Sequence, residues 1–277
     1  MLGRKQSFLA NPSTYYIRFE LSPFDYTIKP ISDSLLGLFM LRDGEFDINI
    51  RSDGIEVWVT KMGDFMNMNT AIIDRTNKVV AIIDPFDSER WFSVLKSEDL
   101  CPTHLLYTHT HRDHTWGYKK MLQLVPDIQV FGHEDADMSD FVHGELFGKV
   151  DFTHKWDNAP NSTIEWSEGG IILKVTHSPG HAPGHVTFHG HGIYHAGDLL
   201  FTAYSGRVDL PGSDPSAQIS SLKNARKILS SLPEDWRLIP GHRYEWIDGT
   251  TPDWVTIKEI LENNFSLNDK SVTSSFS

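Results

Sequence analysis

Residues 108–114 read Thr-His-Thr-His-Arg-Asp-His, and this stretch decides both the expected fold and the expected chemistry. It follows a short apolar run that predicts a buried strand. Imidazole nitrogens and carboxylate oxygens together suit zinc or iron. Four such side chains within so short a stretch cannot easily all reach one ion. A tight turn can send His109 and His111 to one ion, and Asp113 and His114 to a second.

Three further ligand-type residues follow other predicted strands, and a glycine precedes each one. They are His181 in Ser178-Pro179-Gly180-His181, Asp198 in Ala196-Gly197-Asp198, and His242 in Pro240-Gly241-His242. Glycine permits the turn that swings such a side chain back toward a site. A histidine-rich surface loop would explain residues 108–114 alone, but it does not explain the whole set. Two ions that share one carboxylate would use all seven residues, and Asp198 is the natural bridge because a carboxylate has two oxygens.

The pattern of apolar runs predicts strands and helices in both halves of the chain. We expect strands near Val57–Val59, Asn69–Asp74, Val79–Ile83, His104–Tyr107, Ile128–Phe131, Ile164–Trp166, Ile171–Thr176, Val186–Phe188, Ile193–His195 and Leu238–Ile239, and helices near 87–96, 116–124, 216–229 and 254–261. Strands that come first, with helices after or between them, predict an α/β fold in which two mixed β-sheets stack as a four-layer αββα sandwich.

The same pattern sets the expected domain organisation. Residues 1–55 show few clear periods and are expected to be an N-terminal extension packed on the core. Residues 56–264 form the main domain, and residues 265–277 form a polar tail.

Length, charge and cysteine content narrow the class of protein. The 277 residues suffice for a substantial core, and 39% hydrophobic content is ordinary for a globular protein. A net charge of −12 disfavours nucleic acid as a partner. The single cysteine, Cys101, cannot form an internal disulfide, and we see neither a signal peptide nor a run long enough to span a membrane. We therefore expect a cytoplasmic protein that acts on a small molecule, without nucleic acid or membrane; a homodimer is compatible with the sequence.

The ordered series His-x-His-x-Asp-His, Gly-His, Gly-Asp and Gly-His resembles the metallo-β-lactamase superfamily, over about Val57 to Asn264. The resemblance implies that His109, His111 and His181 hold a first metal ion. It implies that Asp113, His114 and His242 hold a second ion, with Asp198 bridging the two, and that Asp113 and Asp198 are the catalytic carboxylates.

The glyoxalase II branch (hydroxyacylglutathione hydrolases) shows the greatest resemblance. Ala196–Phe201 is similar to the Gly-Asp-x-Leu-Phe run of that branch, Gly206-Arg207 to its Gly-Lys/Arg, and Gly241-His242-Arg243-Tyr244 to its Gly-His-Glu-Tyr. The resemblance implies that Arg207 and Tyr244 bind substrate. Two departures concern glutathione: Arg243 replaces the usual Glu, and the C-terminal segment lacks the Arg-x-x-Lys pair that grips it.

These features predict a dinuclear metal-dependent hydrolase that uses two divalent ions, with zinc expected and iron or manganese as alternatives. A hydroxide between the metals would attack a carbonyl, most simply that of an acyl-glutathione-like thioester. A lactonase or esterase of the same fold is the first alternative. The second is a mononuclear iron persulfide dioxygenase, which the chain resembles through Gly180–Val186 and Gly206–Asp209; His109, His181 and Asp198 would then hold the iron. A β-lactamase and a nuclease are both disfavoured.

Overall fold

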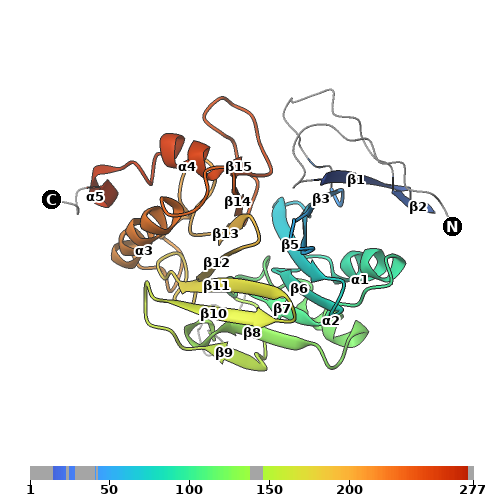
Figure 1. Cartoon of the computed structure of the whole chain (residues 1–277). Coiled ribbons are helices and arrows are strands. Elements are labelled where there is room, and N and C mark those ends of the chain that lie inside the picture. Colours follow the sequence, from blue (N-terminus) through green and yellow to red (C-terminus); the bar gives the residue numbers. More distant parts are fainter. Residues whose placement is uncertain (1–14, 23–24, 29–40, 42, 138–145, 274–277) are drawn as a thin grey trace.

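The computed structural model describes residues 15–22, 25–28, 41, 43–137 and 146–273. These residues form two mixed β-sheets that stack face to face between two layers of helices (Figure 1). The expected four-layer αββα sandwich is therefore confirmed.

The first sheet contains nine strands among the described residues. In spatial order they are β2 (Asp25–Ile28), β1 (Tyr15–Ser22), β3 (Phe46–Ile50), β4 (Glu56–Met62), β5 (Asn67–Asp74), β6 (Val79–Ile83), β7 (His104–Leu106), β8 (Gln129–His133) and β9 (His154–Trp156). The strands from β6 to β9 pair in parallel, and the others pair antiparallel. Parallel neighbours place their carboxyl ends at one edge of the sheet, so the segments after β6 and β7 emerge side by side.

The second sheet contains six strands among the described residues. Their order is β10 (Thr163–Glu168), β11 (Ile171–His177), β12 (Val186–Gly190), β13 (Ile193–Gly197), β14 (Arg237–Pro240) and β15 (Val255–Thr256). Only β13 and β14 pair in parallel. The predicted strand positions therefore agree with the structure, whereas the short strands β9 and β15 were not predicted.

Helices cover the two outer faces of the sandwich. α1 (Ser88–Ser97) and α2 (Tyr118–Leu124) pack on the first sheet, and α3 (Pro215–Leu229), α4 (Ile257–Asn263) and α5 (Lys270–Thr273) lie beside the second (Figure 1). A short 3₁₀ helix, η1, spans Glu134–Ala136. Asp214 caps the N-terminus of α3, because its carboxylate accepts hydrogen bonds from the backbone N–H groups of Ser216 and Ala217.

Three apolar clusters correspond to the three interfaces between the four layers. The first sheet and its helices share a cluster around Trp58 and Trp91, and the two sheets share one around Ile72 and Phe188. The second sheet and its helices bury a third cluster around Leu222. Burial on both faces explains why the central strands have nearly continuous apolar sequences.

The region before Glu56 differs from the irregular segment that we expected. Its strands β1 and β3 continue the first sheet by pairing with each other and with β4, and Phe46 and Ile48 are buried in the core. At the other end of the chain, Leu267 and Val272 are buried against the second sheet's helices. The predicted domain boundaries at 55 and 264 stay predictions, and residues 1–14 and 274–277 lie outside the described part. None of the described helices combines the length and apolar character needed to cross a bilayer.

Candidate metal centre

Four loops bring the seven predicted ligand residues together at one edge of the sandwich. Residues 109–114 follow β7 of the first sheet, whereas His181, Asp198 and His242 follow β11, β13 and β14 of the second. Two glycines are required there. Gly197 has φ +51°, and a Cβ on Gly241 would lie 2.0 Å from the Asp198 Oδ1 atom. Glycine at these positions therefore allows the backbone to approach the ligand carboxylate.

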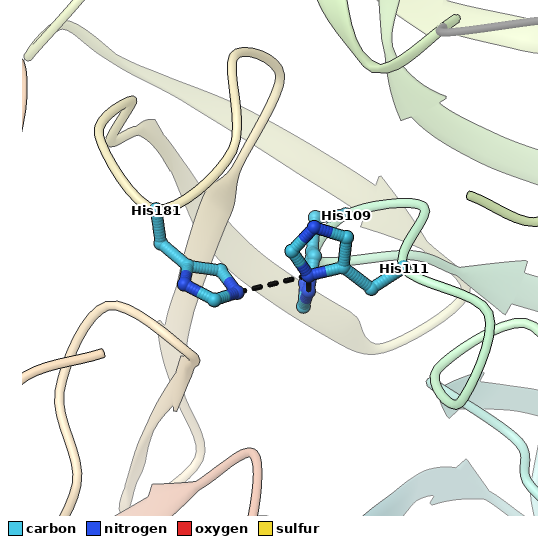
Figure 2. A group of neighbouring side chains, drawn as sticks. All are labelled: His109, His111 and His181. Carbon is cyan, nitrogen blue, oxygen red and sulfur yellow. Dashed lines mark hydrogen bonds between the residues drawn. The ribbon is translucent and has the colours of Figure 1, made fainter. Parts of the chain in front are cut away.

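His109, His111 and His181 form the first ligand group (Figure 2). The His111 Nδ1 atom lies 3.0 Å from the His109 Nε2 atom and 2.9 Å from the His181 Nε2 atom. All three side chains are buried. The imidazoles thus point three nitrogen atoms at a common point.

The hydrogen bonds of the outward nitrogens identify what the first group can hold. His109 Nδ1 donates to the Thr108 hydroxyl, because that hydroxyl itself donates to Asp84, and His181 Nδ1 donates to the Arg207 carbonyl. Neutral His109 and His181 therefore present lone pairs to the His111 Nδ1 atom, and one proton cannot satisfy three nitrogens. A tetrahedral ion with Zn–N bonds of 2.0–2.1 Å would separate its nitrogen ligands by about 3.3 Å, which these distances approach.

Asp113, His114 and His242 form the second ligand group. The His114 and His242 Nε2 atoms lie 3.2 Å apart, and the Asp113 Oδ2 atom lies 3.1 Å from His242 Nε2 and 3.7 Å from His114 Nε2. His242 Nδ1 donates to the Phe65 carbonyl at 2.8 Å, and His114 Nδ1 donates to Asp84 at 2.9 Å. Both histidines therefore direct Nε2 inward, as metal-ligating histidines do.

Asp198 lies between the two groups. Its Oδ2 atom is 3.4 Å from His181 Nε2 in the first group and 3.5 Å from His242 Nε2 in the second, and its Oδ1 atom is 3.3 Å from His114 Nε2. The carboxylate is 6% exposed, and its Oδ1 atom accepts no hydrogen bond from the described residues. A buried anion in this position requires nearby cations.

The two groups differ in their titration. Burial, with the other imidazoles of the site, lowers the pKa of His111 to about 3 and holds the pKa of His109 well below its ordinary value. Burial opposes a charge on His242 as well, but the carboxylates of Asp198 and Asp113 outweigh it and raise the pKa of His242 to about 9. The first group is therefore neutral before any ion binds, whereas the second already attracts positive charge.

Asp84 supports both groups, and sequence reasoning missed it. Its Oδ1 atom accepts the Thr108 N–H at 2.8 Å, and its Oδ2 atom accepts the Thr108 hydroxyl at 2.6 Å as well as His114 Nδ1. A signal was present in the sequence, because Asp84 stands before Pro85 at the end of a predicted strand. β6 and β7 are parallel neighbours, so the residue after β6 lies beside the ligand loop after β7.

Asn67 is a second supporting residue that the sequence did not reveal. Its side-chain amide donates to the Asp113 Oδ2 atom at 3.2 Å, and its backbone forms a bridge with His242. Asn67 is 1% exposed. It therefore orients Asp113 from the start of β5.

The other residues considered from sequence occupy distinct positions. His185 is buried; its Nε2 atom accepts the Asp198 backbone N–H at 3.0 Å, so it supports the bridge residue. The exposed Arg207 side chain pairs with Asp209 at 2.6 Å, while its carbonyl holds His181. The Tyr244 ring lies 5.8 Å from the His242 ring, which places it beside the second group.

His133, Asp135 and His177 form another cluster of ligand-type residues. His133 Nε2 and His177 Nδ1 both bond to the Asn158 carbonyl, and His177 Nε2 bonds to the Pro183 carbonyl. Backbone groups therefore occupy the ring nitrogens of both histidines, so these nitrogens are not directed at a common ion position.

Comparison with known families supports the geometry. The sequence model described as "Metallo-beta-lactamase superfamily" matches residues 63–242. The hydroxyacylglutathione hydrolase of Aeromonas salmonicida is 32% identical over 163 residues, which cover 59% of this chain and 56% of that protein. Haemophilus influenzae hydroxyacylglutathione hydrolase GloC is 30% identical over 214 residues, 73% of this chain and 94% of that protein. The chain thus spans little more than half the length of the first relative.

Solved structures share the same architecture. The BLEG-1 B3 metallo-beta-lactamase superposes with a TM-score of 0.62 at 25% identity, over 77% of this chain and all of that one. TTHA1623 in a di-iron-bound form superposes with a TM-score of 0.57 at 27% identity, over 75% of this chain and 98% of that one. ETHE1 from Myxococcus xanthus superposes with a TM-score of 0.60 at 20% identity, over 79% of this chain and 92% of that one. At this identity the likeness concerns the fold alone.

Proposed function

Because the chain belongs to the metallo-β-lactamase superfamily, we propose that it is a dinuclear metal-dependent hydrolase that cleaves a thioester or a related ester. The observation that carries the proposal is the convergence of seven side chains, whose facing ligand atoms lie 2.9–3.7 Å apart. The relatives named hydroxyacylglutathione hydrolase support a thioester as the substrate bond.

The residues fit two ions that share one carboxylate. His109, His111 and His181 would hold the first ion, Asp113, His114 and His242 the second, and Asp198 both. When bound, two divalent ions supply Lewis acidity, which ionises a water near neutral pH and polarises a carbonyl. Zinc suits this set of nitrogen and oxygen ligands, and the di-iron form of TTHA1623 makes iron the alternative.

The chain's own residues would contribute orientation and negative charge. Asn67 and His242 hold the Oδ2 atom of Asp113, whose side chain is 26% exposed. Burial would raise the pKa of Asp113, but the neighbouring imidazoles hold it below its ordinary value, so the group is an anion at neutral pH. Asp113 is therefore present as the anion that an ion in the second group requires, and Asp198, held through its backbone by His185, would keep the two ion positions together.

The substrate-binding roles of Arg207 and Tyr244 belong to the same proposal. Arg207 lies next to the first group through its carbonyl, and Tyr244 lies next to the second through ring contact. A cytoplasmic location and a possible homodimer stay predictions.

The test measures metal content and activity on the same preparation. We expect about two zinc ions per chain by elemental analysis, and hydrolysis of at least one thioester in a panel that also contains lactones. The Asp198→Asn variant serves as the control and should lose both. About one iron per chain, with oxygen uptake on glutathione persulfide, would instead establish the dioxygenase alternative. Metal-free protein that stays inactive after supplementation would contradict both readings.

A further inference from the structure

We propose that the substrate carries a bulky apolar acyl group, a medium-length alkyl chain or an aromatic ring, and that this group lies on an aromatic surface beside the second ligand group. The inference rests on the proposed hydrolase function and names its substrate class. We define the aromatic surface as Phe65, Phe86, Trp116, Tyr204 and Tyr244, together with the buried Phe201 ring that Tyr244 contacts.

Three side chains of the aromatic surface are strongly exposed to solvent. Phe65 is 66% exposed, Trp116 is 63% exposed and Tyr204 is 59% exposed, although large apolar side chains are usually covered. Outside the metal-centre loops, exposed large apolar residues such as Ile172 on β11 and Ile219 on α3 belong to regular elements. Exposed apolar residues that gather at one place indicate a binding site.

One half of the aromatic surface is built around His242. The Phe201 ring lies 4.7 Å from the Tyr244 ring and 6.1 Å from the His242 ring. Tyr204 adjoins Phe201, because its carbonyl accepts the Phe201 N–H at 2.7 Å. Tyr204 also stacks on Phe265, which holds its ring in place. These rings therefore begin at a predicted ligand and extend outward.

The other half approaches His242 from the turn between β4 and β5. Phe65 lies in this turn, and its carbonyl accepts His242 Nδ1. The Phe86 ring covers Gly63 in the same turn, since a Cβ on that glycine would lie 2.5 Å from the ring. Phe86 in turn stacks on Trp116, two residues after His114. Both halves thus meet at the second ligand group.

The first ligand group has a different neighbour. Its His181 is held by Arg207, whose guanidinium pairs with Asp209 at the surface. Aromatic rings therefore gather on the His242 side, whereas the His181 side carries the Arg207–Asp209 ion pair at the surface and the buried Phe147 ring against His111. A substrate whose carbonyl lies between the two groups would place an apolar portion on the rings and a polar portion near Arg207. That asymmetry favours a bulky acyl group over a small one such as acetyl.

The experiment measures binding of product-like carboxylates, which requires no turnover. Acetate, hexanoate and decanoate are titrated calorimetrically into zinc-loaded protein. We expect affinity to rise by about threefold per added methylene until the rings are covered, and at least about a hundredfold from acetate to decanoate. Phe65→Ala and Trp116→Ala should each weaken decanoate binding by about tenfold and leave acetate binding unchanged.

Ile172→Ala is the matched control, because it truncates an exposed apolar side chain at the start of β11, the end of that strand opposite the His181 loop. It should change neither affinity. Equal affinity for all three carboxylates, or the same loss in Ile172→Ala as in Phe65→Ala, would overturn the inference. Acetyl and decanoyl thioesters are assayed in parallel. Graded binding without hydrolysis would contradict only the proposed function, whereas hydrolysis without graded binding would contradict only the role of the aromatic surface.

Discussion

Three imidazoles meet in the first ligand group, whereas the second combines two imidazoles with a carboxylate of its own. Neutral groups hold the outward nitrogens of two of the first group's histidines: the Thr108 hydroxyl holds that of His109, and the Arg207 carbonyl holds that of His181. The second depends on the charged Asp84 and on the turn that contains Phe65. The comparison indicates that the second group is more sensitive to charge and to distant parts of the chain.

One distant part is the segment before Glu56. The Leu41 N–H donates to Asp253 at 2.6 Å, and Arg243 donates to both the Leu41 carbonyl and Asp253. Arg243 directly follows the ligand His242, and its backbone N–H donates to the Met66 carbonyl. The N-terminal segment is thus tied to the second group.

The largest effect should come from the one residue that both groups share. Asp198→Asn keeps the shape of the side chain but removes the charge that faces both groups, so both ions should be lost. We expect well under one ion per chain by elemental analysis and a roughly thousandfold fall in kcat/KM. Asp209→Asn, an exposed carboxylate change, should leave the metal content unchanged. Two ions in Asp198→Asn would show that the groups do not need the shared carboxylate.

The next largest effect should come from Asp84, which supports both ligand groups, and a second variant at Thr108 should separate the two groups. Asp84→Asn places an amide where His114 Nδ1 now donates, so His114 should lose its inward lone pair, and zinc affinity should fall by about 10- to 100-fold. Thr108→Val removes only the hydroxyl that accepts from His109 and should weaken the first group alone. Chelator competition measures both affinities. A Thr108→Val variant that weakens both groups equally would contradict the division.

A smaller effect should be confined to the second group. Asn67→Ala removes the amide that orients Asp113, so the zinc ion in the second group should bind about tenfold less tightly. The first zinc serves as the internal control and should be unaffected. Loss of both ions together would mean that Asn67 maintains the loop rather than Asp113 alone.

The last prediction concerns pH and the support from Asp253. Burial raises the pKa of Asp253 to about 6, above its value of about 3.8 in the unfolded chain. The folded protein then binds the extra proton between these values, so the Asp253 contribution to folding stability falls as pH rises from about 4 to 6. The loss is at most about 3 kcal/mol. Between pH 4 and 6, denaturant unfolding of metal-free Asp253→Asn should therefore show a stability that falls less, or rises more, with pH than that of the parent, and equal slopes would contradict the prediction.

Sequence predicted the layers and the gathering of the ligand residues well, because both depend on local patterns. Apolar runs such as Val79–Ile83 coincide with strands, and each ligand lies in the loop that follows a strand. The order of strands in each sheet did not follow from the sequence, since pairing depends on contacts between distant segments.

The supporting residues could not be predicted for the same reason. Asp84 and Asn67 are ordinary polar residues at strand ends, and only parallel pairing of β6 with β7 and the turn before β5 bring them to the ligands. Strand β3 was missed although Phe46, Ile48 and Ile50 alternate with polar residues, as in a half-buried strand, because the segment before it has no clear period. β3 is fixed in the sheet by its antiparallel pairing with β4, and this pairing cannot be read from the residues of β3 alone.

Each ligand group draws from both sheets: the β7 loop belongs to the first sheet, whereas His181 and His242 belong to the second. An ion in either group therefore acts as a clip across the sandwich, and its binding energy is available only to the folded chain. By mass action, each tenfold rise in free ion above its dissociation constant adds about 1.4 kcal/mol to the free energy of unfolding. The melting temperature of this protein should consequently report the zinc concentration around it.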